Sequence, residues 1–515
     1  MDVPLYLMSA AGAISLTVML GLRDRRQRRH AIVSNFPIVG RFRYLAEELG
    51  GPLRQYIVTG NDEERPFSRD QRRWIYASSK KENNYFGFGT DNDLEQTPGY
   101  IIIRQSAFPV SSPAPGSAHY DKEYQVPAAK VLGGHRQRKH AFRPTSIVNT
   151  SAMSYGSLSR KAVEAINRGV ALAGAWQNTG EGGISDHHRH GGDLLWQIGT
   201  GYFGCRDPKG SFSMERFLES VASAKVRAIE IKLSQGAKPG LGGVLPKEKI
   251  TPEIAKIRLV PLGQDCISPA SHSAFSDVDT LLDFIERLAD ATGLPVGIKS
   301  AVGDLGFWRE LATKMDVTKR APDFITIDGG EGGTGAAPLA FSDHVSMPFK
   351  LGFASVYRAF AERGMHEKVV FIGSGKLGFP EQGMLAMALG CDLINVAREA
   401  MLSIGCIQAQ MCHTGTCPTG VATQSEWLMG GLDPTLKAAR LANYLLTLRK
   451  EMLSLSHACG EWHPALVGLE RIELIDGFKS VSAPEIFGYE PGWGLPATEE
   501  RTEIRGLMMT RAGAA

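Results

Sequence analysis

The sequence predicts an α/β protein built on a (β/α)8 TIM-type barrel, with an N-terminal extension and one transmembrane helix ahead of it. From about Ile147 onward, short apolar runs rich in β-branched residues alternate with stretches that have helical spacing. Some of these strand-like runs end in Lys232, Lys299 or Asp328, as expected when a site lies at the carboxyl ends of barrel strands. A doubly wound open sheet is the alternative, but no convincing GxGxxG motif opens a first βα unit.

The barrel is predicted from the order of its elements. The strand-like runs read SIVNTSAMS, RAIEIKLS, LPVGIKS, DFITIDGG, KVVFIGSGK and CDLINVA, and the helix candidates include SRKAVEAINRGVALAG, VDTLLDFIERLADATG and PEQGMLAMALG. Alternating strands and helices favour a parallel sheet covered by helices. We place the barrel at residues 121–440, after an extension at 31–120 and before a C-terminal helical tail at 441–515.

Residues 1–30 are predicted to form a membrane anchor with an Arg-rich flank. The stretch from Val3 to Leu22 has no charged side chain, and a bilayer core requires about 20 apolar residues of a helix. Because RDRRQRRH follows, the positive-inside rule places the barrel in the cytoplasm, as part of a single-pass membrane protein. A cleaved signal peptide is disfavoured because no basic side chain precedes the apolar run. A buried apolar helix of a soluble protein is the other alternative.

The composition is that of an ordinary folded protein, with 43% hydrophobic and 22% charged residues. A net charge of +3 gives no reason to expect nucleic-acid binding. The 7 cysteines are too sparse for a secreted disulfide scaffold, so a reducing compartment is the more natural interpretation.

Three cysteines stand close together, at Cys406, Cys412 and Cys417 in GCIQAQMCHTGTCPTGVATQ. Neither spacing matches one face of a helix, so the segment is predicted to wrap as a loop. Thiolates are soft ligands that suit iron–sulfur clusters or zinc. Structural zinc usually takes four ligands at closer spacing, so three thiolates favour a three-iron cluster. Zinc with His413, or three reduced cysteines in a core loop, remain alternatives.

Two glycine-rich loops follow late strands, in DFITIDGGEGGTGAAP and FIGSGKLGFPEQG. Backbone N–H groups in such loops can cradle a phosphate. Two consecutive late strands with these endings fit the phosphate site that barrels build after strands seven and eight. Either loop alone is weak evidence, because glycine-rich turns are common; together they favour a phosphorylated cofactor.

Charged side chains follow two earlier strands. Lys232 lies in IEIKLSQGAKPGLGG, where a lysine within a strand is unusual unless it is paired or functional, and Lys238 lies in the loop beyond it. Such cations can stabilise a reduced flavin or bind an acidic substrate. Asn178, Thr179 and Glu181 end another strand or begin its loop. A salt-bridged core lysine and a solvated loop lysine are the alternatives.

Six motifs together resemble the FMN-binding synthase domain of glutamate synthase, over roughly residues 120 to 470. They are, in order, SAMSYGSLS, NTGEGG, IKLSQGAKPGLGG, CISPASHS, DGGEGGTGAAP and CHTGTCPTGVATQ. The resemblance is strongest to stand-alone large-subunit-like members. It implies an FMN-bearing barrel, a [3Fe-4S] cluster and the reductive amination of 2-oxoglutarate through 2-iminoglutarate. Electrons would pass from the cluster to FMN, and reduced FMN would give a hydride to the imine carbon.

The resemblance also assigns residues, position by position. It implies that Glu181, Lys238 and Arg258 lie near the oxoacid and that Cys406, Cys412 and Cys417 ligate the cluster. The flavin residues that it implies are Met153, Ser154, Lys232, Gln235, Gly332, Gly333, Thr334, Gly373, Ser374, Gly375 and Lys376. Where the family has a glycine-rich phosphate contact this chain reads NVAREA, so we expect Arg398 to supply a charge to the phosphate instead.

The family's glutaminase and pyridine-nucleotide domains are not expected in this chain. Ammonia or another amine would then be free or supplied by another protein, and electrons would come from ferredoxin, a partner reductase or a membrane donor. Two alternative functions follow from this expectation. One is synthesis of an N-substituted glutamate from another amine, and the other is a non-catalytic electron-transfer or scaffold role.

Overall fold

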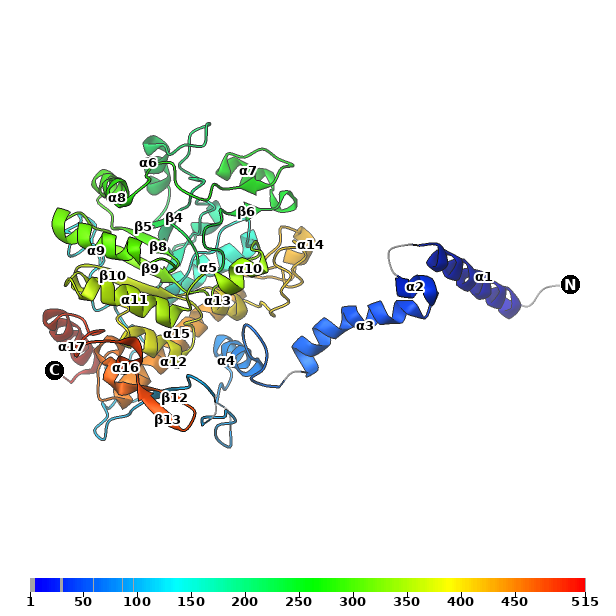
Figure 1. The fold of residues 1–515 in the computed structure, drawn as a ribbon. Helices are drawn as coiled ribbons and strands as arrows, with labels where there is room; N and C mark the ends of the chain where they lie inside the picture. The colour runs from blue at the N-terminus through cyan, green and yellow to red at the C-terminus, as the bar shows by residue number, and fades with distance from the viewer. Residues whose placement is uncertain (1–4, 28–30, 59, 86, 96, 515) are drawn as a thin grey trace. The chain divides into compact units, whose positions relative to one another are not determined.

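The computed structural model describes residues 5–27, 31–58, 60–85, 87–95 and 97–514 (Figure 1). The chain divides into two compact units, Met1–Arg72 and Arg73–Ala515. The first unit contains α1 (Leu5–Arg26), α2 (Ala31–Asn35), α3 (Gly40–Leu53) and a π-helical turn at Arg54–Val58. Within it the buried carboxylate of Asp24 accepts hydrogen bonds from the Arg41 guanidinium and from the backbone N–H of Ile38. This contact fastens the end of α1 to the start of α3.

The transmembrane prediction for residues 1–30 is not supported. Across the described ranges, no helix combines the length and the apolar character that crossing a membrane requires. The last turn of α1 is polar, since it contains Arg23, Asp24, Arg25 and Arg26, and Val3 lies outside the described residues. The single-pass membrane location inferred from the predicted helix is therefore wrong.

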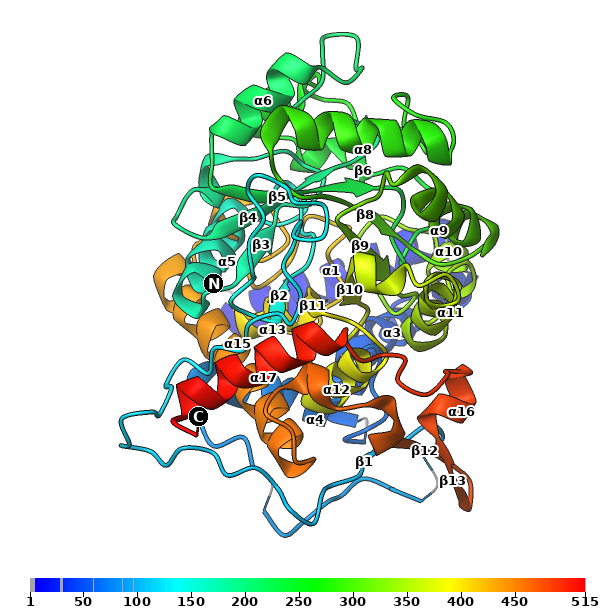
Figure 2. The same ribbon diagram turned by 90° about the vertical axis from the view of Figure 1, so that its left-hand side faces the viewer.

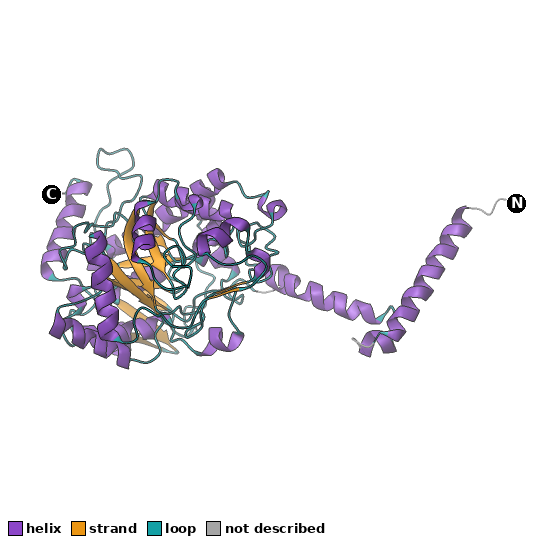
Figure 3. Cartoon of the chain, turned by 90° about the horizontal axis from the view of Figure 1, so that it is seen from above, coloured by secondary structure: helices purple, strands orange, loops and turns teal. Residues whose placement is uncertain are grey.

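The second unit contains a closed barrel in which eight parallel strands surround a common interior, counted over the described residues (Figures 2 and 3). In chain order the strands are β2 (Val148–Thr150), β3 (Trp176–Asn178), β4 (Asp193–Ile198), β5 (Val226–Lys232), β8 (Val296–Ser300), β9 (Phe324–Asp328), β10 (Val370–Ser374) and β11 (Leu393–Val396). Each strand pairs with the next, and β11 closes the ring by pairing in parallel with β2. The predicted TIM-type barrel is confirmed.

Helices cover the outside of the barrel (Figure 3). They are α5 (Arg160–Ala173), α6 (Met214–Ala222), α8 (Val278–Thr292), α9 (Gly306–Thr318), α11 (Phe349–Ala361), α12 (Pro380–Ala388) and α15 (Pro434–Ala458). The link from β3 to β4, which the structure describes in full, holds only a short 3-10 turn at Asp186–His188. The long helix α15 follows the last strand and packs along α5.

Burial explains why these strands read as nearly continuous apolar runs. Every residue of β8, β9, β10 and β11 is buried, because helices cover one face of the sheet and the barrel interior covers the other. Helix ends carry their own signals: the Asp277 side chain accepts from the backbone N–H of Thr280 at the start of α8, and Gly293 ends that helix with a positive φ of 70°.

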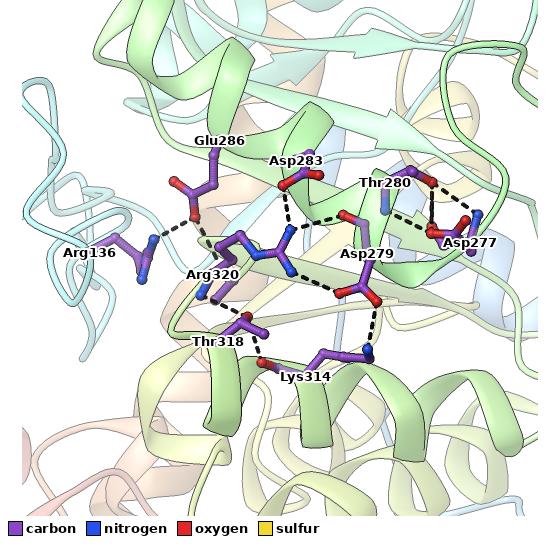
Figure 4. A network of polar contacts seen from close by, with 10 residues as sticks. Arg136, Asp277, Asp279, Thr280, Asp283, Glu286, Lys314, Thr318 and Arg320 are labelled. Carbon is purple, nitrogen blue, oxygen red and sulfur yellow. Dashed lines mark hydrogen bonds and ion pairs between the residues drawn. The ribbon is translucent and has the colours of Figure 1, made fainter.

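Ion pairs fasten α8 to α9 (Figure 4). Asp279 on α8 lies 2.5 Å from the Lys314 ammonium on α9 and 2.8 Å from the Arg320 guanidinium just beyond that helix. Arg320 also pairs with Asp283. These ion pairs hold together the helix that precedes β8 in the chain and the helix that follows it.

The remaining elements extend the barrel. An insertion between β5 and α8 contains β6 (Val244–Leu245), α7 (Pro252–Arg258) and β7 (Cys266–Ile267). Shorter helices α10 (Leu339–His344), α13 (Arg398–Ser403) and α14 (Glu426–Met429) follow late strands. A separate sheet has the order β1-β12-β13, with β1 at Ile101–Ile103, β12 at Ile472–Asp476 and β13 at Lys479–Ser482. Helices α4 (Arg69–Lys80), α16 (Ala483–Phe487) and α17 (Thr498–Ala512) complete the chain.

Candidate functional site

A cavity with an open volume of about 630 Å³ lies at the carboxyl ends of the barrel strands. Its wall combines residues from the ends of β4, β5, β8, β9, β10 and β11 with the loops that follow them. This is the end of a TIM barrel at which active sites are built, because the loops there can vary without disturbing the strand core.

A buried ion pair forms one side of the cavity. The Lys232 ammonium, on the last residue of β5, donates hydrogen bonds to Glu181 Oε1 at 2.8 Å and to Gln235 Oε1 at 2.7 Å. The side chains of Lys232 and Glu181 are only 9% and 15% exposed, so water does little to screen the pair. The loop after β3 is thus joined to the end of β5 by a charged contact.

Further cations surround Glu181. Burial alone would raise the pKa of Glu181, but Lys232, Lys238 and Arg258 lower it below its usual value, so this carboxylate is ionised at neutral pH. Burial and the charge of Lys232 lower the pKa of Lys238 to about 8. Lys238 donates to the backbone oxygen of Gly242 at 3.0 Å. The result is a compact cluster of one carboxylate and three cations.

A second ion pair lies on the neighbouring strands. Lys299, near the end of β8, lies 3.4 Å from Asp328 Oδ2 at the end of β9, and both line the cavity. The same carboxylate oxygen accepts the backbone N–H of Gly236 at 3.0 Å. Gly236 must be glycine, since a Cβ there would lie 1.8 Å from the carbonyl oxygen of Gly329. Asp328 thereby holds the loop after β5 against the loop after β9.

The opposite side of the cavity is built by the last two strands. Ser374, the last residue of β10, lies 3.2 Å (Oγ to Oγ) from Ser151, in the segment after β2. Lys376 and Arg398 follow β10 and β11 and stand in the same wall. Arg398 donates to the backbone oxygen of Glu331, and burial lowers the pKa of its guanidinium. This side of the cavity therefore combines the hydroxyl groups of Ser151 and Ser374 with the cations Lys376 and Arg398, which follow the strands.

The first of the two glycine-rich loops follows β9, the sixth barrel strand, and the second follows β10, the seventh. The expectation that they follow strands seven and eight is therefore wrong by one strand. The eighth strand, β11, ends at Val396 and contributes Ala397 and Arg398 to the cavity. The residues that follow β11 form no glycine-rich loop, so the signal in the sequence was weaker there.

The structure brings most of the residues assigned by the resemblance to this cavity. Ten stand in its wall: Ser154, Glu181, Lys232, Gln235, Gly332, Gly333, Ser374, Gly375, Lys376 and Arg398. Five lie outside the wall: Met153, Lys238, Arg258, Thr334 and Gly373. Gly373 faces away because side chains alternate along a strand and Ser374 faces inward; a Cβ on Gly373 would meet Leu377 and Cys391.

Ten further wall residues were not among those that the resemblance assigned. They are Ser151, Ala152, Gly180, Gln197, Ala237, Lys299, Asp328, Asn395, Ala397 and Glu399. For Lys299 and Asp328 the position at a strand end was the signal. For Gln197 and Asn395 the signal was a polar side chain within a buried strand. Gln197 donates to Glu230, a fully buried carboxylate that also accepts from Asn178 and Thr326.

Arg258 is the last residue of α7 and lies outside the cavity wall. Its guanidinium donates to the backbone oxygen of Tyr155 at 2.9 Å. The Tyr155 hydroxyl donates to Glu253 on α7 at 2.6 Å, and His187 Nε2 lies 3.1 Å from the same carboxylate. Burial and the nearby Glu253 charge raise the pKa of Tyr155. These contacts connect α7 to the segments after β2 and β3.

The three clustered cysteines lie in the loop after α13, as predicted. Burial raises the pKa of the Cys406 thiol to about 11, and Cys412 and Cys417 add to that effect. Burial also raises the pKa of Cys412, whereas Thr419 and several backbone N–H groups outweigh burial at Cys417 and lower its pKa. In the described part of the chain, no three His, Cys, Asp or Glu side chains are arranged to hold a metal ion.

The cysteine loop adjoins the cavity wall. Gly332 and Gly333 line the cavity, and a Cβ on Gly335 would lie 3.3 Å from the Cβ of Cys412. The glycine-rich loop after β9 therefore runs from the cavity to the cysteines. The buried Lys249 ammonium donates to the backbone oxygens of Cys412 at 2.7 Å and Ala422 at 3.1 Å.

Residues 122–461, more than half of the chain, match the conserved region in glutamate synthase. The chain belongs to the glutamate synthase family. The family resemblance inferred from the six motifs is thereby confirmed, and the protein is a glutamate synthase-like oxidoreductase.

Relatives of this glutamate synthase family member cover most of its length. The glutamate synthase large subunit-like protein YerD of Bacillus subtilis (strain 168) is 38% identical over 477 residues, which is 87% of this chain and 90% of that protein. The archaeal glutamate synthase (NADPH) of Methanocaldococcus jannaschii is 36% identical over 311 residues, which is 60% of this chain and 58% of that protein. Among solved structures, a mutant flavocytochrome b2 with pyruvate bound has a TM-score of 0.43 at 12% identity, over 84% of this chain and 85% of that one.

Proposed function

We propose that the protein reductively aminates 2-oxoglutarate to glutamate at the cavity, by hydride transfer from reduced FMN to an imine. The observation that carries the proposal is the buried Lys232–Glu181 pair in the cavity wall, joined by Gln235 and flanked by Lys238. An anionic oxoacid and a partly cationic imine need charges of both signs at one place. The family membership supplies the reaction class, and this cluster supplies the charges.

The residues present fit an FMN group. Lys376 and Arg398 offer cations to a phosphate, and Gly332 and Gly333 allow close approach of the backbone. Lys232 is a buried cation that would favour a reduced, anionic flavin ring. Both polar atoms of the Asn395 amide are buried without a hydrogen-bond partner among the described residues, as expected where a polar ligand completes the site. Bound in this cavity, FMN would supply the hydride.

The chain's own residues would bind and orient the oxoacid. Carboxylate binding falls to Lys238, with Arg258 adding positive charge from behind the cavity wall. Glu181 is ionised, and its carboxylate would accept an N–H of the imine while holding the Lys232 ammonium in place. The deep position of the pair limits water, which would otherwise hydrolyse the imine.

A [3Fe-4S] cluster on Cys406, Cys412 and Cys417 would deliver electrons to this cavity. The donor set has the right chemistry, because soft thiolates suit iron–sulfur clusters. The three cysteines belong to one loop after α13, although the described side chains do not stand in a ligand arrangement. The close approach of Gly335 to Cys412 supports short-range electron transfer to a flavin beside Gly332 and Gly333.

The nitrogen source and the electron donor are part of the proposal. We expect free ammonia, or ammonia supplied by another protein, and electrons from ferredoxin or a partner reductase. The name of the archaeal relative includes NADPH, so a pyridine-nucleotide reductase is one form that such a partner could take.

The deciding experiment is anaerobic purification followed by absorption spectroscopy, EPR spectroscopy and turnover. A flavin spectrum, a three-iron EPR signal, and glutamate formation from 2-oxoglutarate, ammonia and a chemical reductant are the expected results. Protein that contains neither flavin nor iron would contradict the proposal. Parallel assays with methylamine test the N-substituted product, and bound cofactors without any turnover would favour an electron-transfer role. Reduced ferredoxin and NADPH with a reductase, supplied in turn, identify the donor.

A further inference from the structure

Asn395 is a buried asparagine whose side chain lacks the hydrogen bonds that its burial demands. It lies on β11, is 2% exposed and lines the cavity. Neither its Nδ2 nor its Oδ1 has a hydrogen-bond partner among the described residues, and both atoms are buried. Buried polar atoms almost always have a hydrogen-bond partner, so two unpartnered atoms in one side chain call for an explanation.

The other buried asparagines of the barrel have hydrogen-bond partners for their amides, so the lack of partners is particular to Asn395. Asn149 on β2, the register partner of Asn395, donates to the backbone oxygen of Ser146 and accepts the backbone N–H of Trp176, both at 3.0 Å. Asn167 and Asn178 also use both amide atoms. Of these four, only Asn395 lines the cavity. The missing partner is therefore expected from the cavity side.

We propose that Asn395 binds the polyol chain of FMN, with its amide donating to one hydroxyl and accepting from another. This inference rests on the proposed function, because it requires a flavin in the cavity. An amide offers a donor and an acceptor at once, and only a group with both capacities satisfies the two together. A phosphate or a carboxylate offers acceptors alone and would leave Oδ1 unpaired, whereas hydroxyls do both.

The position of Asn395 along the strands agrees with this assignment. Asn395 is in register with Ser374, which has a hydroxyl contact with Ser151. Parallel strands run toward the cavity mouth, so Lys376 and Arg398 lie nearer the rim than Ser374 and Asn395. A phosphate held at that rim places its polyol chain deeper, beside the hydroxyls and the amide.

The test compares Asn395→Leu with the matched control Asn149→Leu, in protein prepared without flavin and then titrated with flavins. Asn395→Leu removes an unpaired buried amide, so the melting temperature of the flavin-free protein should rise, whereas Asn149→Leu breaks two hydrogen bonds and should lower it. Asn395→Leu should weaken binding of FMN and of riboflavin about tenfold, by the same factor. Lumiflavin, which has no polyol chain, should bind the variant and the natural protein equally.

The outcomes separate this inference from the proposed function. If the natural protein binds no FMN, both are overturned. If it binds FMN but Asn395→Leu leaves the affinity unchanged, this inference alone is overturned. An equal loss of affinity for lumiflavin would place the amide at the flavin ring and overturn the polyol assignment. A lower melting temperature for flavin-free Asn395→Leu would show that Asn395 has an internal structural role, which also overturns the assignment. Asn395→Ala, taken through the same flavin series, serves if the leucine variant does not fold.

Discussion

The Lys232 ammonium, at the end of β5, lies 2.8 Å from the carboxylate of Glu181, which stands in the loop after β3. Each charge depends on the other, because neither is exposed enough for water to replace its partner. Gln235 and Lys238 complete the cluster from the loop after β5. The charges of the cavity therefore depend on this contact. Removing either residue should change both the stability and the activity of the protein.

Replacing Lys232 with Met leaves Glu181 buried without its principal counter-charge. We expect the free energy of unfolding to fall by about 3–5 kcal/mol and turnover to fall about 100-fold. Chemical unfolding curves and steady-state assays measure the two effects. The double variant with Glu181→Leu should recover most of the stability and none of the activity. A stable Lys232→Met protein with normal turnover would contradict the assigned role.

The same pair predicts how stability depends on pH. The cations around Glu181 hold its pKa below its ordinary value of 4.5 in the folded protein. A carboxyl group with a lowered folded pKa stabilises the protein above its unfolded pKa and loses that effect as the pH falls through the folded pKa. Stability should therefore decline below about pH 4.5, and Glu181→Gln should flatten this part of the profile. Unfolding curves from pH 3 to 7 provide the measurement.

Lys238 predicts a change in substrate binding on the alkaline side. Burial and the Lys232 charge lower its pKa to about 8 in the folded protein. As it loses its proton, the KM for the oxoacid should rise above about pH 8, and Lys238→Arg should move that rise to higher pH. The unfolded chain binds the proton more tightly, so stability should increase with pH between about 8 and 10.5. A KM profile that is the same for both proteins would exclude Lys238 from oxoacid binding.

Much of the barrel could be predicted because its parallel strands are buried on both faces and read as apolar runs. The strand at Asp193–Ile198 was missed because the link before it holds no α-helix, so the usual rhythm of strand and helix breaks there. At the N-terminus, an uncharged run was interpreted as a membrane span, but α1, which contains most of it, ends in a charged turn whose Asp24 pairs with Arg41 of α3. Sequence spacing cannot show such a contact.

The candidate site could be predicted where a charged side chain lies at the end of a strand. Lys232 was singled out in this way, because a charged side chain there has few structural uses. Ser374 was assigned through the glycine-rich loop and the family resemblance. Asn395 and Gln197 were missed, since one polar residue within a buried strand also fits a purely structural role. The difference between Asn395 and Asn149 lies in their hydrogen bonds, which depend on segments far apart in the chain.

We expect the cysteine loop to be needed for the proposed cluster and not for the binding of flavin. Serine in place of Cys406, Cys412 or Cys417 should reduce iron and acid-labile sulfide to near zero and remove the EPR signal, while bound flavin stays near one per chain. Cys459→Ser, a buried cysteine outside the loop, is the matched control and should keep its iron. Full iron content in all three loop variants would contradict the assigned ligands. Loss of flavin together with iron would instead indicate that the loop supports the cavity wall.

Glu253 predicts a positioning effect on oxoacid binding. Its carboxylate accepts from Tyr155 and pairs with His187, while the backbone oxygen of Tyr155 holds Arg258. Glu253→Ala should free α7, let Arg258 move away from Glu181, and raise the KM for the oxoacid several-fold with little change in kcat. Glu253→Gln keeps an acceptor for the Tyr155 hydroxyl and should restore most of the affinity. Lys256→Ala, an exposed change on the same helix, should leave KM unchanged. If Glu253→Ala lowers kcat and leaves KM as it was, then α7 acts on the chemical step, and a role confined to holding Arg258 for the oxoacid is excluded.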